Sequence, residues 1–194
     1  IPEGIEKIPG YAFHNCGFTK IRIPGTVREI GNGAFTDCKN LEEVEFEEGL
    51  ESIEGFAFSK TKIKSVKLPS TLKMLSGFNS TPMESIEIPE GVTEIKAGAF
   101  STTNLRQVKF PKSLEFIGHR AFSNTRIEKI EIPENVYWMD NGAFSKCAEL
   151  KEIKLPGRIE YRQVTRRSFT GTNVIVEDGG LGFGLFEDCV KLEK

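Results

Sequence analysis

The sequence lacks the features that define several large classes of protein. No run of about 18 apolar residues occurs, so no segment is predicted to be a transmembrane helix. The 26 basic and 28 acidic residues leave a formal net charge of -2, whereas nucleic-acid-binding domains usually carry a basic excess. We therefore expect no direct insertion into a membrane and no nucleic acid partner.

Residues with recognisable catalytic or metal-binding chemistry are also scarce. Of the two histidines, His14 is expected to be an exposed turn residue, and His119 has no second histidine or cysteine positioned as a zinc partner. No Gly-x-Ser-x-Gly, His-Glu-x-x-His or Walker-type motif is present. The glycine-rich segment Gly180–Gly184 lacks the lysine and the strand-loop-helix context of a phosphate-binding loop. We predict no enzymatic activity, no cofactor and no metal.

The sequence does contain an internal repeat of roughly 22 residues, a length that indicates a stacked solenoid. The unit Ile132–Lys154 recurs from these starting points: Ile1, Ile23, Phe46, Leu68, Ile88, Phe110 and Leu155. We predict one domain over residues 1–194 with about eight to nine turns of the solenoid, called rungs below, and irregular rungs at 68–87 and 155–194. Because both ends fall within a repeat, we expect the chain to be a fragment of a longer protein.

Each repeat contains two short segments with the character of strands. In the second repeat Val44 and Phe46 alternate with glutamates, as in a half-buried strand, and a proline usually ends this strand. Val27 and Ile30 then mark a second extended segment. One phenylalanine per repeat is expected in the core; the column consists of Phe13, Phe35, Phe58, Phe78, Phe100, Phe122, Phe144, Phe169 and Phe186.

The position three residues after that phenylalanine holds only cysteine or threonine. The column consists of Cys16, Cys38, Thr61, Thr81, Thr103, Thr125, Cys147, Thr172 and Cys189. We expect each threonine hydroxyl to bond a nearby backbone group and each thiol to be buried and reduced. Cys147 and Cys189 should be two rungs apart, with Thr172 between them, beyond the about 7 Å limit for a disulfide.

The repeating motif Ile-Pro-x-x-Val-x-x-Ile-x-x-x-Ala-Phe-x-x-Cys-x-x-Leu-x-x-Val resembles that of the BspA-like leucine-rich repeat family. Phe35, Cys38, Leu41 and Val44 fall where this motif places them, and the match covers nearly the whole chain. The resemblance implies a β-rich α/β leucine-rich-repeat solenoid, right-handed and curved, with parallel strands on its concave side and short turns or helical turns between them. It also implies a cell-surface or secreted protein active in adhesion or protein interaction, without shared catalytic residues.

Outward charges on the predicted strands alternate in sign from repeat to repeat: Arg22, Glu45, Lys67, Glu87, Lys109, Glu131 and Lys154. In a parallel stack in register, each charge would lie beside opposite charges on the neighbouring rungs. We interpret this pattern as a self-neutralising ladder. A charged groove for an ionic ligand fits less well, because alternating charges cancel at a distance.

A second outward column becomes aromatic toward its end: Lys7, Glu29, Ser52, Met74, Glu94, Phe116, Trp138 and Tyr161. Aromatic and arginine side chains dominate interaction hot spots. We therefore predict a binding site formed by Phe116, Tyr137, Trp138, Tyr161, Arg158, Arg162, Arg166 and Arg167. The expected partner is a protein, either a host surface or matrix protein or a second copy of the chain. The alternative is that these rings pack under irregular C-terminal rungs.

These patterns favour a non-enzymatic binding scaffold located at the cell surface or secreted. One alternative is a glycan-binding module, in which Asn135, Asp140 and Asn141 would converge with the aromatic rings. The other is a structural spacer that displays another domain of a longer protein.

Overall fold

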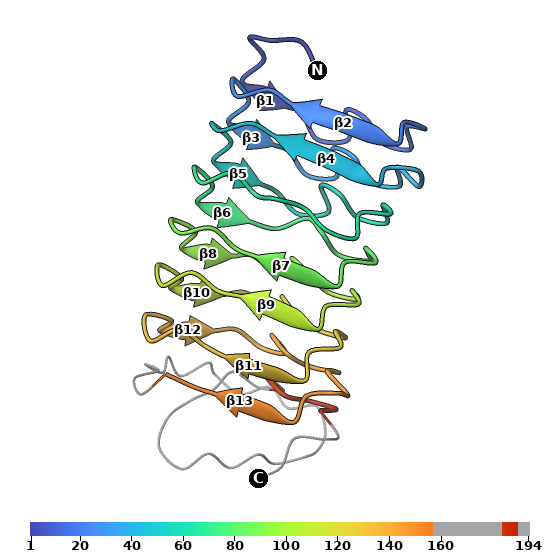
Figure 1. Ribbon diagram of the computed structural model, residues 1–194. Helices are drawn as coiled ribbons and strands as arrows, with labels where there is room; N and C mark the ends of the chain where they lie inside the picture. Colours follow the sequence, from blue (N-terminus) through green and yellow to red (C-terminus); the bar gives the residue numbers. More distant parts are fainter. Residues whose placement is uncertain (157–183, 190–194) are drawn as a thin grey trace.

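The computed structural model describes residues 1–156 and 184–189, which form a stack of parallel rungs (Figure 1). A seven-stranded parallel sheet takes one two-residue strand from each of seven rungs. In spatial order its strands are β1 (Lys7–Ile8), β3 (Glu29–Ile30), β5 (Ser52–Ile53), β6 (Met74–Leu75), β8 (Glu94–Ile95), β10 (Phe116–Ile117) and β12 (Trp138–Met139).

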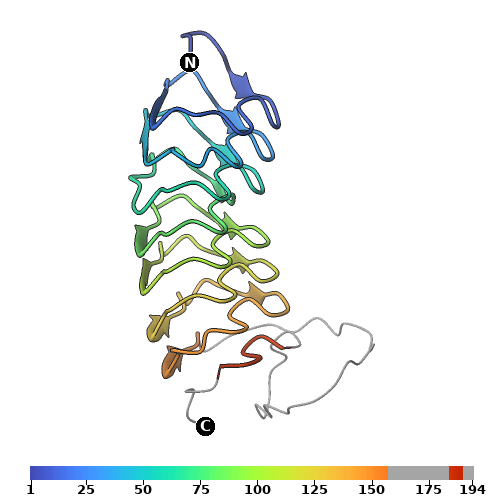
Figure 2. The same cartoon turned by 90° about the vertical axis from the view of Figure 1, so that its right-hand side faces the viewer.

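Longer strands form a second column, in three parallel pairs (Figures 1 and 2). The pairs are β2 (Lys20–Ile23) with β4 (Glu43–Phe46), β7 (Ser85–Glu87) with β9 (Gln107–Lys109), and β11 (Lys129–Glu131) with β13 (Glu152–Lys154). Between β4 and β7, residues 61–69 form no strand, although their sequence repeats the pattern of the other rungs. The parallel-strand solenoid with short turns is therefore confirmed.

The connections between strands are turns throughout the described ranges, which contain no helix. The helical turns implied by the family resemblance, and with them the α/β part of the predicted fold class, are not confirmed. It follows that the described residues also offer no helix able to cross a bilayer.

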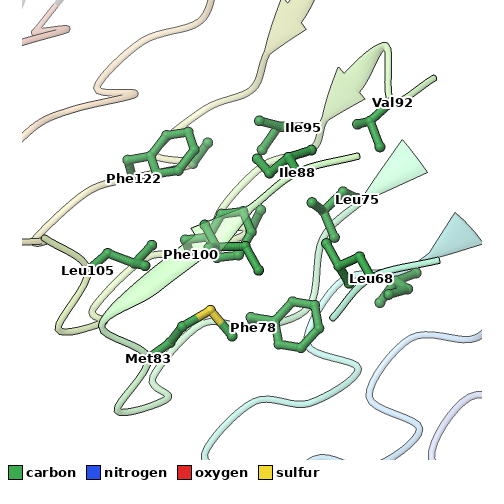
Figure 3. Packing of buried hydrophobic residues seen from close by; sticks show 14 of the residues in the cluster. Leu68, Leu75, Phe78, Met83, Ile88, Val92, Ile95, Phe100, Leu105 and Phe122 are labelled. Carbon is green, nitrogen blue, oxygen red and sulfur yellow. The ribbon is translucent and has the colours of Figure 1, made fainter. Parts of the chain in front are cut away.

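The inward positions of the repeat form one continuous core. Val27, Ile30 and Leu41 are fully buried, as their spacing predicts, and Val44 is buried on β4. Figure 3 shows the same arrangement in the middle of the stack, where Phe78 and other apolar side chains of successive rungs pack together. Since each rung buries its apolar side chains against its neighbours, stability arises mainly between rungs.

The phenylalanine column forms a ladder of nearly parallel rings through this core. Neighbouring ring centroids lie 5.1–6.1 Å apart, with interplanar angles of 4–20°. The backbone is also hydrogen-bonded between rungs along this column: the amide of Phe122 donates to the carbonyl of Ala143 on the next rung at 2.8 Å. The rings run in the order Phe13, Phe35, Phe58, Phe78, Phe100, Phe122, Phe144 and Phe186.

The last described rung corrects the predicted order of this column. Phe186 stacks directly on Phe144 at 6.1 Å, and the amide of Phe144 donates to the carbonyl of Leu185 at 3.0 Å. No rung lies between them, so the predicted place of Phe169 between these two rings is wrong. In the sequence, Phe169 follows Phe144 by close to one repeat length. Backbone hydrogen bonds, and not this spacing, decide which segments are neighbours.

Cysteines and threonines of the shared column form different hydrogen bonds. The hydroxyls of Thr61, Thr81 and Thr103 donate to the phenylalanine carbonyl of their own rung at 2.8–2.9 Å, as predicted. In contrast, Cys38 Sγ donates to Phe13 O at 3.0 Å on the preceding rung. Threonine therefore closes its own turn, whereas this cysteine links two rungs.

All four cysteines are free thiols in the structure. Burial raises the pKa of the Cys38 thiol, which keeps it protonated and unreactive. One premise of the prediction is nevertheless wrong. Cys147 and Cys189 lie on adjacent rungs, because the rung of Phe186 stacks directly on that of Phe144.

Part of the predicted ladder of outward charges pairs between rungs as expected, whereas Arg22 pairs with Glu47 and Glu3 instead of its register partner Glu45. Glu87 is the register partner of Lys109, and Glu131 is that of Lys154. Both pairs form exposed ion pairs, and the hydrogen bond from Lys109 to Glu87 raises the pKa of Lys109. Lys67 falls in the segment without a strand, where the ladder of paired strands is interrupted.

Reversing one charge of this ladder should destabilise the protein modestly. Lys109→Glu places a carboxylate opposite Glu87, and we expect a loss of about 1 kcal/mol or less, larger at low salt. The charge swap Glu87→Lys with Lys109→Glu should recover part of that loss. Denaturant unfolding of both single variants and the double variant gives the coupling energy. A coupling of zero at low salt would show that the alternation has no role in stability.

Candidate binding surface

The register of the seven-stranded sheet places Phe116 and Trp138 in one column, as the repeat predicts; Tyr161 lies outside the described residues. Trp138 of β12 is the partner of Phe116 of β10, which in turn is the partner of Glu94 of β8. The same register continues to the other end of the sheet through Met74, Ser52, Glu29 and Lys7. The two rings are thus neighbours at one end of a column that is otherwise mostly polar.

Two buried side chains flank the two aromatic rings of the β12 rung in the sequence. Val136 and Met139 are buried, as predicted, and Tyr137 is 51% exposed. Phe116 and Trp138 are half-buried, so they lie against the sheet with part of each ring at the surface. Together the three side chains form an aromatic surface, with its most exposed ring at Tyr137.

A hollow of about 440 Å³ opens beside Phe116, where small residues on consecutive rungs leave space. The small residues that line it are Gly55, Ser76, Ala97 and Gly118. Adding a Cβ to Gly118 would bring it within 2.7 Å of the backbone nitrogen of Ala97, which shows how closely the rungs approach there. The polar side chains that line the hollow are Glu94, Lys96, His119 and Asp140.

A second, smaller hollow of about 280 Å³ adjoins the first. It is lined by Thr93, Glu94, Glu115, Phe116 and Tyr137, and it shares Glu94 and Phe116 with the larger hollow. We call the two hollows together the β8–β12 groove. The groove thus combines two aromatic rings with carboxylates and one ammonium group.

The charges in and near the β8–β12 groove are only partly compensated. Lys96 is paired with Glu54, with Nζ 3.3 Å from Oε2. The described residues contain no ion pair that involves Glu94 or Glu115. Asp140 uses Oδ1 to accept the amide of Asn141 at 2.7 Å. The groove therefore carries an excess of negative charge.

The repeat identifies the family once the fold is known. A model of the BspA type leucine rich repeat region matches residues 1–77 and 75–177, with six copies. The chain belongs to this family.

Solved structures of bacterial leucine-rich repeat proteins have a similar fold. A leucine-rich repeat protein from Bacteroides ovatus is 28% identical, with a TM-score of 0.74, over 97% of this chain and 58% of that one. A leucine rich cell surface protein from Faecalibacterium prausnitzii is 30% identical, with a TM-score of 0.61, over 77% of this chain and 42% of that one. This BspA-type chain therefore spans about half the length of these two relatives. A comparison with curated proteins found no match.

The fold of a leucine-rich repeat protein from T. pallidum is also similar, at 22% identity and a TM-score of 0.63, over 99% of this chain and 74% of that one. At this identity the likeness concerns the fold alone.

Three of the predicted site residues, Phe116, Tyr137 and Trp138, come together on this BspA-type solenoid. The other five lie outside the described residues: Tyr161, Arg158, Arg162, Arg166 and Arg167. Of the polar residues considered for a glycan site, Asp140 lines the groove. Asn135 instead donates its side-chain amide to Lys112 O at 2.7 Å.

The acidic residues of the groove were not among the site residues predicted from the sequence. Glu94 belongs to the same column as Phe116, so a signal for it was present in the repeat register. Glu115 and Lys96 could be assigned only from the packing of neighbouring rungs. His119 lines the groove, and among the described residues no group of three or more His, Cys, Asp or Glu side chains could hold a metal ion.

Proposed function

We propose that this chain is a non-enzymatic scaffold, located at the cell surface or secreted, that binds a protein partner through the β8–β12 groove. Leucine-rich repeats of this family suggest a protein-interaction scaffold. The observation that carries the proposal is the aromatic surface of Phe116, Tyr137 and Trp138 on a sheet face whose other outward positions are mostly polar.

Burial of these rings would supply a large part of the binding free energy. Complete burial of a large apolar side chain stabilises by about 1.5–3 kcal/mol, and Tyr137 leaves half of its surface in water. Tyrosine and tryptophan are also enriched among the few residues that dominate protein interfaces. The cell-surface relative from Faecalibacterium prausnitzii supports the proposed location.

A glycan is the second candidate ligand. Asp140 lines the same hollow as Phe116, so a polar group and a ring face one space. A sugar could stack on the ring and hydrogen-bond to the carboxylate. A second copy of the chain is a further form of protein partner, since an aromatic surface can also serve self-association.

The double substitution Tyr137→Ala with Trp138→Ala tests the proposal. Binding of the purified chain to arrays of host surface proteins, matrix proteins and glycans would be measured, together with its mass in solution. We expect binding to a protein to weaken at least about tenfold, as for loss of a hot spot, with a nearly unchanged unfolding midpoint. Glu29→Ala and Met74→Ala, in the same column, are the matched controls and should bind normally.

The alternatives predict different results in this assay. Binding to glycans alone, lost in the double variant, would support the glycan module. Normal binding together with a large loss of stability would show that the rings serve the core. If the wild-type chain binds neither class and does not self-associate, the spacer interpretation would replace the proposal.

A further inference from the structure

We propose that the β8–β12 groove receives a positively charged side chain, arginine or lysine, from its protein partner. This inference rests on the proposed function and specifies the chemistry that the partner presents. It is carried by the smaller hollow, where two carboxylates and two aromatic rings line one space of about 280 Å³.

The carboxylates of this hollow differ from those elsewhere on the same sheet face. Glu29 is paired with Lys7 and Glu51 with Lys73, each with nitrogen and oxygen 2.8 Å apart. Within the described residues, Glu94 has no such partner, and its register neighbours Met74 and Phe116 carry no charge. On this sheet face, ion pairs therefore compensate Glu29 and Glu51 but not Glu94 within the described residues.

Glu115, the residue before Phe116, likewise has no cationic neighbour on the adjacent rungs. The equivalent residues of neighbouring rungs are Thr93 and Tyr137, because the backbone amide of Tyr137 donates to Glu115 O at 3.1 Å. Neither neighbour can neutralise a carboxylate at pH 7. The one ammonium group among the residues that line the groove, that of Lys96, is paired with Glu54. Two carboxylates thus share a hollow without a cation in the described part of the chain.

The rings make the hollow suited to an organic cation rather than to an acidic or neutral group. Phe116 and Tyr137 line it together with Glu94 and Glu115. The face of an aromatic ring attracts a guanidinium or ammonium group within about 6 Å of its centroid, and carboxylates form strong charge-assisted hydrogen bonds to the same groups. The aliphatic stem of arginine or lysine would cover the exposed part of the rings.

The single tryptophan, Trp138, allows this to be measured directly, since it is the register partner of Phe116. The probes are hexa-arginine and hexacitrulline, which have nearly the same shape but differ in charge, and neither of which contains tryptophan. We expect hexa-arginine to change the emission of Trp138 in a saturable manner. Hexacitrulline should produce no saturable change at the same concentrations.

Two variants test which groups of the groove are responsible. Glu94→Gln with Glu115→Gln should weaken hexa-arginine binding about tenfold, and Tyr137→Ala should weaken it about threefold through loss of the ring. The matched control is Glu87→Gln with Glu131→Gln, which removes the same charge from the longer strands. This control should bind within about twofold of wild type, because exposed charges at a distance are screened by salt.

The inference is overturned if hexacitrulline binds as well as hexa-arginine, or if the control variant loses as much affinity as the groove variant. The failure of the proposed function is a separate result. A protein found on the array that requires Tyr137 and Trp138 but is indifferent to Glu94→Gln with Glu115→Gln would preserve the proposed function and remove the inference. If hexa-arginine binds in the groove but no array protein depends on the rings, the groove's affinity for a cationic side chain would stand and the proposed function would fail.

Discussion

Phe122→Ala should lower the free energy of unfolding by about 3–5 kcal/mol, the usual range for a buried phenylalanine. The ring is completely buried. It stacks between Phe100 at 5.4 Å and Phe144 at 5.3 Å, and Phe110 meets it edge-on at 5.5 Å. Truncation leaves a cavity lined by three rings, and the rigid backbone ladder around it prevents the neighbouring rungs from closing the space.

Denaturant unfolding followed by circular dichroism and by Trp138 fluorescence measures this effect. Each rung buries its apolar side chains mainly against its direct neighbours, so a cavity in the middle of the stack weakens the coupling between the two halves. We therefore also expect the two probes to give separate transitions in Phe122→Ala.

Phe13→Ala is the matched control for this prediction. Phe13 is only half-buried and stacks on one side alone, against Phe35 at 5.2 Å. Its truncation should destabilise by clearly less, since loss of exposed area and a smaller cavity both reduce the effect. If both substitutions destabilise equally, the position of the ring in the ladder does not determine its contribution.

Gly49→Ala should be the second severe substitution. Gly49 has a φ of 134°, a backbone angle that residues with a side chain rarely adopt. An added Cβ would lie 2.1 Å from the carbonyl oxygen of Gly25 on the preceding rung. The strained backbone costs about 1–3 kcal/mol and the overpacking about 1–3 kcal/mol more. We expect a loss of unfolding free energy of about 2–6 kcal/mol in total.

The matched control separates the two terms. Gly98 also has a positive φ, 64°, but an added Cβ there meets no atom within 4 Å. Gly98→Ala should therefore show the conformational term alone, about 1–2 kcal/mol. Equal unfolding free energies for the two variants would show that the contact between Gly49 and Gly25 relaxes without loss.

Much of the architecture could be predicted from the repeat because the period itself specifies neighbours. Once Phe35 and Phe58 occupy the same phase, a parallel stack places their rings together, and they lie 5.1 Å apart. The same reasoning correctly placed Phe116 beside Trp138 and Glu87 beside Lys109. In each case, backbone hydrogen bonds between rungs convert equal spacing in the sequence into contact.

Only the tertiary structure decided where that correspondence fails. Phe169 has nearly the right spacing, yet Phe186 is the ring that stacks on Phe144, because the next rung is defined by its hydrogen bonds and not by its distance along the chain. The phase of Cys147 and Cys189 was correct, whereas their separation in rungs was not.

The β8–β12 groove is another feature that only the tertiary structure decided. The sequence by itself determined that Phe116, Tyr137 and Trp138 gather at one end of the sheet. The hollow beside them depends on the volumes of small residues such as Gly55, Ser76 and Gly118, which come from different rungs. The negative charge of the groove likewise depends on which cations reach which carboxylates. Volumes and ion pairs are properties of side chains in space, so the period of the sequence cannot specify them.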